Sequence, residues 1–185
     1  LNAIVVGVIS NSSKSGALQT AEDRSIPALH ISRLHFVSND EYEQHLLKVL
    51  FDLNTDLVIL AGYMKMMPER IVRHYKNRML NIHPALLPAF GGKGLYGRNV
   101  HQAVLDYGCK VSGVTVHLVD AEYDTGAPVM QRCVPVLDDD TAETLAARVL
   151  LEEHKIYADA IRLFADGRIK IEGRRIRVLS GSEKI

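Results

Sequence analysis

Short apolar runs alternate along the chain with stretches in which apolar residues recur at helical spacing. A run of about 4 to 8 apolar and β-branched residues between turn formers is typical of a buried strand. The run at 57–62 (LVILAG) has this character and indicates a strand that is covered on both faces. The same pattern predicts strands at 3–10, 27–31, 57–62, 79–83, 111–119 and 129–136.

Helical periodicity and end signals predict the remaining elements. Leu46, Val49 and Leu53 recur three and four residues apart, as on the apolar face of a helix. Asp140 followed by Glu143 has the spacing of a capping box, and Gly167 is suited to end the long helix that follows. These signals predict helices at 17–23, 40–53, 68–75, 99–106 and 140–167, and a hairpin of strands at 169–171 and 176–179.

The alternation of strands and helices predicts the α/β fold class. We expect a mostly parallel twisted sheet flanked by helices, in a single domain that covers residues 1–185. In such sheets ligands bind outside the carboxyl ends of the strands. Residues 86–98, which contain a proline and several glycines, are expected to form a flexible loop.

Composition narrows the class of protein. Lys plus Arg equals Asp plus Glu, 22 of each, so the chain lacks the basic footprint of nucleic-acid binding. The longest apolar run is far shorter than the roughly 20 residues that cross a bilayer. Two cysteines form neither a disulfide scaffold nor a metal-ligand motif. We therefore expect a cytoplasmic protein with small-molecule partners, and no nucleic acid, membrane or metal.

The stretch at 79–84 (MLNIHP) carries the most informative chemistry. Strand side chains alternate between faces, so Asn81 and His83 project together at the carboxyl end of this strand. An amide N–H can stabilise a developing oxyanion, and a histidine is matched to proton transfer near neutral pH. The alternative is an asparagine in a turn and a histidine that hydrogen-bonds to a loop.

Asp124 and His117 are associated with the next strand along the chain. A carboxylate in an Asp-x-Gly turn commonly serves only to form the turn. If the carboxyl ends of two strands bring Asp124 close to His83, the carboxylate raises the pKa of the imidazole and holds it protonated. His117 is expected to be a supporting histidine and not a catalytic one.

Glu153 lies near the middle of the apolar stripe of the last predicted helix, and Glu152 lies nearer its edge. A carboxylate on an inward face must be paired or neutral, so Glu153 is a candidate ligand for a substrate amine or hydroxyl. Pairing with a neighbouring basic residue is an equal alternative. The arginines at 174, 175 and 177 are expected to form a solvated face.

Several stretches together resemble the phosphoribosylglycinamide formyltransferase family. They occur in family order and cover almost the whole chain. They are 57–64 (LVILAGYM), 79–88 (MLNIHPALLP), 113–119 (GVTVHLV), 124–126 (DTG), 148–157 (RVLLEEHKIY) and 164–167 (FADG). The Asn-x-His-Pro motif with a downstream His and Asp-x-Gly is specific for folate-dependent formyl transfer, and the Glu-His-x-Ile-Tyr stretch favours this family within that superfamily.

The resemblance implies a Rossmann-like formyltransferase fold and an activity. A formyl group would pass from the co-substrate 10-formyltetrahydrofolate to the primary amine of glycinamide ribonucleotide in purine biosynthesis, without a metal. Asn81 would stabilise the oxyanion, His83 would donate a proton, and Asp124 would raise the pKa of His83. The implied folate-binding residues are Met64, Lys65, Met66, Met67, Asn81, Asp120, Ala121, Glu122, Tyr123 and Asp124, and the implied substrate contacts are Leu150, Leu151, Glu152 and Glu153.

Three expectations complete the sequence-based picture. Leu1 matches the residues before the family's second strand, so we expect the first β-α unit and its phosphate-binding turn to be missing from an N-terminally incomplete catalytic domain. The oligomer is expected to be a monomer or a homodimer. Two alternatives to the transferase remain open: hydrolysis of 10-formyltetrahydrofolate with the same three residues, or a folate- or nucleotide-binding module without catalysis.

Overall fold

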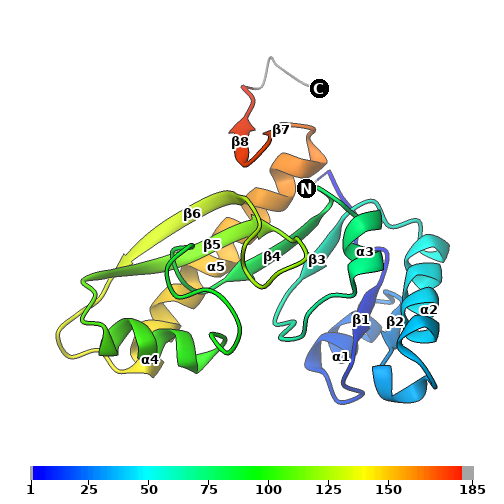
Figure 1. Ribbon diagram of the computed structural model, residues 1–185, viewed down its shortest axis with the longest axis horizontal. Helices are drawn as coiled ribbons and strands as arrows, with labels where there is room; N and C mark the ends of the chain where they lie inside the picture. The colour runs from blue at the N-terminus through cyan, green and yellow to red at the C-terminus, as the bar shows by residue number, and fades with distance from the viewer. Residues whose placement is uncertain (1, 181–185) are drawn as a thin grey trace. The chain divides into compact units, whose positions relative to one another are not determined.

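The computed structural model describes residues 2–180, which divide into two compact units. The smaller unit comprises residues 3–56 and 68–74, and the larger comprises 57–67 and 75–180 together with residue 2. The α/β fold class is confirmed, because each unit combines strands with helices (Figure 1). The single domain over 1–185 and the missing first β-α unit stay predictions.

The smaller unit is built on two short parallel strands, β1 (Val8–Ser10) and β2 (Ala28–His30). Its helices are α1 (Gly16–Glu22), the 3-10 helix η1 (Arg33–His35), α2 (Asn39–Asp52) and α3 (Glu69–His74). A serine hydroxyl accepts a backbone N–H at the start of α1, η1 and α2, which satisfies donors that a helix leaves unpaired. The strand predicted over 3–10 is reduced to β1, since only Val8–Ser10 pairs with β2.

The larger unit contains a four-stranded sheet in the order β3 (Val58–Leu60), β4 (Met79–His83), β5 (Val111–Leu118) and β6 (Pro128–Pro135). Strands β3 and β4 are parallel, but β5 is antiparallel to both of its neighbours. The predicted mostly parallel sheet is therefore corrected to a mixed one. The pattern misled because a strand buried on both faces has the same continuous apolar run in either direction.

Helix α5 (Ala142–Ala165) supplies much of the core of this unit (Figure 1). It packs against β5, β6 and the shorter helix α4 (Arg98–Asp106). Leu145, Val149 and Ile156 on its inner stripe have no exposed surface, and neither do Val114 and Val116 of β5. Burial of side chains this large contributes about 1.5 to 3 kcal/mol each, which fixes α5 against the sheet.

The start of α5 differs by one residue from the predicted cap. Thr141 and Thr144 form the capping box, each hydroxyl accepting the other residue's backbone N–H. Asp140 instead binds the guanidinium of Arg148 through both carboxylate oxygens and accepts the Leu137 N–H. These charge-assisted bonds hold the pKa of Asp140 well below its usual range.

The chain continues into the predicted hairpin, formed by β7 (Ile169–Glu172) and β8 (Arg175–Val178). Gly173 in its turn has a φ of 62°, a conformation that glycine adopts without strain. Arg174, in the same turn, donates from Nη1 to the Thr125 carbonyl at 2.9 Å. It is therefore solvent-exposed, as predicted, but it also contacts the loop after β5. No helix among residues 2–180 has both the length and the apolar character needed to cross a membrane.

Candidate active site

Strand β4 places Asn81 and His83 on one face of the sheet, as strand alternation predicts. Their partners on β5 are His117 and Thr115, so four polar side chains share this face. His83, Thr115 and His117 are all buried. Four buried or partly buried polar groups on one sheet face require internal hydrogen bonds, and those bonds define the geometry of the site.

The two ring nitrogens of His83 face different groups. Nε2 lies 2.8 Å from the Phe90 carbonyl oxygen, and Nδ1 lies 3.6 Å from Oδ2 of Asp124. A carbonyl oxygen can only accept a hydrogen bond, so Nε2 carries a proton and donates it. Nδ1 is therefore the nitrogen of His83 that can gain and lose a proton, and it does so beside a carboxylate.

Burial lowers the pKa of His83 below its ordinary value. The Asp124 charge and the Phe90 carbonyl raise the pKa, but they do not fully offset burial, and His117 lowers it further. The Asp124 charge thus acts in the predicted direction, but burial outweighs it, so the pKa of His83 is not raised above its ordinary value as the sequence-based prediction expected.

Asp124 reaches His83 by a different route from the one expected. Since β5 is antiparallel to β4, the carboxyl end of β5 lies beside Leu80, at the start of β4, and not beside His83. The loop that leaves β5 turns back over the sheet face, with Asp124 itself at a φ of 57°. Asp124 Oδ2 accepts the Gly92 N–H at 2.9 Å. Burial raises the pKa of Asp124, but the nearby His117 and His83 rings and the hydrogen bond from the Gly92 N–H lower it overall.

Gly126 explains why the Asp-x-Gly motif needs its glycine. A Cβ at this position would lie 1.7 Å from the Leu118 carbonyl oxygen and 3.4 Å from Nδ1 of His117. The loop can therefore close onto the end of β5 only where the residue has no side chain. The motif is a site of close backbone approach as well as a turn.

Thr115 and Gln131 fix the loop that follows His83, and sequence reasoning did not single them out. Thr115 Oγ1 donates to the Ala85 carbonyl at 2.7 Å and accepts the Leu87 N–H at 3.0 Å. Gln131 Nε2 bridges the Leu87 carbonyl and Thr115 Oγ1. These bonds anchor the segment that delivers the Phe90 carbonyl to His83. The available sequence signal was a threonine within the strand predicted at 111–119.

Helix α5 carries the four predicted substrate contacts in two kinds of environment. Leu150 and Leu151 are exposed, and Glu152 forms ion pairs with Arg132 and Lys155. Glu153 has no hydrogen-bond partner among residues 2–180, and burial raises its pKa. Glu153 is thus the carboxylate of the two that remains available to a ligand, whereas Glu152 is already paired with basic residues.

Apart from Asn81 on β4, the predicted folate residues lie in two loops of the larger unit. Met64 and Met66, in the loop after β3, are 63% and 50% exposed, which is unusual for methionine and leaves them open to contact a ligand. Asp120 accepts bonds from the Thr125 hydroxyl and the Glu122 N–H, which orders the loop that carries Asp124. Among the described residues no cluster of three His, Cys, Asp or Glu side chains suits a metal ion.

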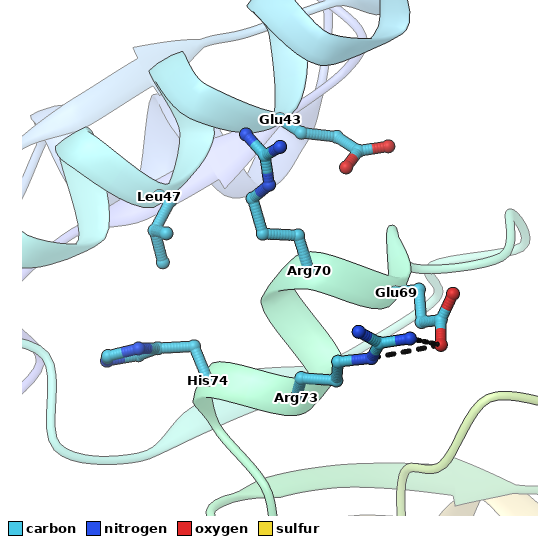
Figure 2. Close-up of a pocket in the computed structure, with 6 residues that line it drawn as sticks. All are labelled: Glu43, Leu47, Glu69, Arg70, Arg73 and His74. Carbon is cyan, nitrogen blue, oxygen red and sulfur yellow. Dashed lines mark hydrogen bonds and ion pairs between the residues drawn. The ribbon is translucent and has the colours of Figure 1, made fainter.

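A separate depression of about 550 Å³ lies in the smaller unit between α2 and α3 (Figure 2). Arg70 and Arg73 in its wall already form ion pairs, with Asp40 and Glu69 respectively. Its two arginines are matched by two glutamates, so no net charge selects a ligand. Its lining residues are Glu43, Leu47, Glu69, Arg70, Arg73 and His74, and none of them belongs to the predicted site.

A model of the formyl transferase family matches residues 1–161 of the chain. The chain belongs to the formyl transferase family, in agreement with the resemblance read from its motifs. Within that family, several of the similar proteins are named phosphoribosylglycinamide formyltransferase. The chloroplastic phosphoribosylglycinamide formyltransferase of Arabidopsis thaliana is 44% identical over 171 residues, and that of Haemophilus influenzae is 35% identical over 170 residues.

The alignments cover 92% of this chain in both cases, but 59% of the Arabidopsis protein and 78% of the Haemophilus protein. A crystal structure of glycinamide ribonucleotide transformylase 1 from Symbiobacterium toebii matches with a TM-score of 0.87 and 43% identity. It covers 94% of this chain and 80% of that protein. The predicted formyltransferase fold is confirmed by this match.

Proposed function

We propose that this chain transfers a formyl group from 10-formyltetrahydrofolate to the primary amine of glycinamide ribonucleotide, a step of de novo purine biosynthesis. The observation that carries the proposal is the grouping of Asn81, His83 and Asp124 on one sheet face, with Nδ1 of His83 3.6 Å from Asp124. The names of the similar proteins support the acceptor substrate, the family resemblance suggests the formyl donor, and the geometry supports the chemistry.

In the proposed reaction the substrate amine attacks the formyl carbon, a C–N bond forms, and the carbonyl oxygen becomes an oxyanion. The Asn81 amide donates an N–H to that oxyanion. Nδ1 of the neutral His83 takes the proton that the attacking amine loses. As the oxyanion collapses, the bond to the folate nitrogen breaks, and His83 returns the proton to that nitrogen. Asp124 stabilises the intervening imidazolium.

We assign the folate and nucleotide contacts to the residues that match the family's binding segments. The exposed loop Met64, Lys65, Met66 and Met67 would contact the flat folate ring, together with the loop from Asp120 to Asp124. Leu150, Leu151, Glu152 and Glu153 would contact the nucleotide substrate. Support is best for Glu153, since a half-buried carboxylate with a raised pKa gains an ionic partner when an amine binds.

The test follows formyl loss from 10-formyltetrahydrofolate with and without glycinamide ribonucleotide. Loss that requires the amine supports the transferase. Equal loss in both reactions would make the protein a hydrolase of the folate, and folate binding without loss would make it a binding module. Glu153→Ala sharpens the assignment, because it should raise KM for the amine substrate while the KM for the folate changes little.

Two further properties belong to the same proposal. The proposed location is the cytoplasm, whereas the Arabidopsis relative is named as a chloroplastic protein. A monomer or homodimer that acts on small molecules, without nucleic acid or membrane, is the proposed assembly. Sedimentation at several protein concentrations tests the oligomeric state.

A further inference from the structure

The ring of His117 is held in one tautomer by the strand that carries it. Its Nδ1 lies 2.7 Å from the carbonyl oxygen of the adjacent Leu118. Because a carbonyl oxygen has no proton to donate, Nδ1 must carry the hydrogen of this bond. In the neutral ring, Nε2 is then left with a lone pair and can only accept.

Nε2 of His117 faces two groups with opposite requirements. Asn81 Nδ2 lies 3.2 Å away, and Oδ1 of Asp124 lies 3.6 Å away. The lone pair of a neutral ring matches the amide nitrogen, which donates. An imidazolium would instead donate to the carboxylate, or to the amide oxygen after the Asn81 side chain had turned over. The shorter contact is the one that suits the neutral ring.

We propose that His117 is a positioning residue that sets the orientation of the Asn81 amide. This role deepens the proposed formyl transfer and rests on it. One N–H of the Asn81 amide is engaged by Nε2 of His117, which leaves the second N–H for the oxyanion of the tetrahedral intermediate. Without an acceptor at Nε2, the amide is free to rotate and to present its oxygen to a developing negative charge.

The surroundings of His117 leave little room for another arrangement. The His117 residue is 2% exposed. Gly126 lies against the same Leu118 carbonyl oxygen that accepts the hydrogen bond from Nδ1 of His117. The titratable groups that face His117 are Asp124, through Nε2, and His83, whose charge interacts with it.

The kinetic test is a double-mutant cycle in the full chain, measured as kcat for formyl transfer. His117→Leu should lower kcat roughly 10- to 100-fold, which is less than the loss of about 10²- to 10³-fold that follows removal of an oxyanion donor itself. In the Asn81→Ala background the same substitution should change kcat less than about twofold, since there is no amide left to orient. His117→Gln, whose carbonyl oxygen can accept the Asn81 N–H, should retain more activity than His117→Leu. Losses that multiply in the double variant would overturn the role.

The second test does not depend on turnover. Long-range ¹H–¹⁵N spectra of the histidine rings distinguish the two neutral tautomers and the imidazolium, and His117→Gln assigns the signal. The expected signal is that of a neutral ring protonated on Nδ1, at about pH 7.5. A ring protonated on Nε2, or an imidazolium, in an active enzyme overturns the positioning role alone. Absence of formyl transfer by the unmutated protein overturns the proposed function, and the role with it.

Discussion

At the scale of single residues, the site depends on hydrogen-bond partners that allow one protonation pattern. Backbone carbonyls determine where each histidine carries its proton: Phe90 at Nε2 of His83, and Leu118 at Nδ1 of His117. Asp124 lies beside the remaining nitrogen of both rings. The backbone thus leaves one nitrogen of each ring beside the carboxylate, and at His83 this is the Nδ1 that exchanges a proton in the proposed mechanism.

Replacement of His83 tests this assignment directly. His83→Ala removes the proton carrier and should lower kcat by about 10²- to 10⁴-fold, the usual range for a general acid or base. Binding of 10-formyltetrahydrofolate, followed by calorimetry, should change little. His45→Ala, at an exposed histidine of the smaller unit, is the matched control. Activity of His83→Ala equal to that of the control would remove His83 from the mechanism.

Asp124→Asn should lower the pKa of His83 further. The Asp124 charge raises that pKa against the effect of burial, so loss of the charge leaves burial less opposed. An amide oxygen can still accept the Gly92 N–H, which preserves the loop. Titration of the His83 ring by NMR in both proteins measures the difference. A pKa that stays the same or rises would show that the carboxylate does not act on His83.

At the scale of elements, two loops converge on the face of β4 and β5. The loop after β4 is held by Thr115 and Gln131, and the loop after β5 is held by Gly126 and by Arg174 of the hairpin turn. These anchors come from four different segments of the chain. The position of Asp124 relative to His83 is therefore a property of the assembled sheet and not of either loop alone.

Gly126→Ala tests the close approach at the end of β5. The new Cβ would meet the Leu118 carbonyl oxygen at 1.7 Å, a backbone atom that cannot move without displacing the strand. We expect a loss of about 3 kcal/mol or more in the free energy of unfolding, measured with urea. Gly16→Ala, where no atom lies within 4 Å of the added Cβ, should leave stability within about 1 kcal/mol. Equal stability of the two variants would refute the packing role of Gly126.

Helices and strands with strong apolar patterns were predictable from the sequence, but the way in which the strands pair in the sheet was less predictable. Helices α2 and α5 and strands β4 and β5 fall close to the predicted ranges, since their apolar residues recur at the period of the element. The antiparallel direction of β5 was not predictable, because a fully buried strand carries no directional signal. Asn81 and His83 were grouped correctly by alternation along one strand. Thr115 and Gln131 were missed, since their partners lie far away in the sequence.

At the scale of the whole molecule, buried histidines link stability to pH. Burial is the largest cause that lowers the pKa of both His83 and His101 below 6.5. His101 on α4 is 4% exposed, and its Nδ1 has no hydrogen-bond partner among residues 2–180. The carboxylates Asp124 and Asp140 also have lowered pKa values, and they respond at lower pH than the histidines.

The sign of the histidine effect follows from proton binding. Between the lowered pKa of the folded state and 6.5, the unfolded chain binds more protons than the folded one, so the free energy of unfolding falls as pH falls. The thermal midpoint should therefore decrease as the pH is lowered from about 7.5 to about 5, before most carboxylates titrate. His101→Leu removes one of the two buried histidines whose pKa is lowered, and one unsatisfied ring nitrogen, so its midpoint should depend less on pH over the same range. Calorimetric scans of both proteins measure the two slopes, and parallel slopes would show that His101 protonates no more easily in the unfolded chain than in the folded protein.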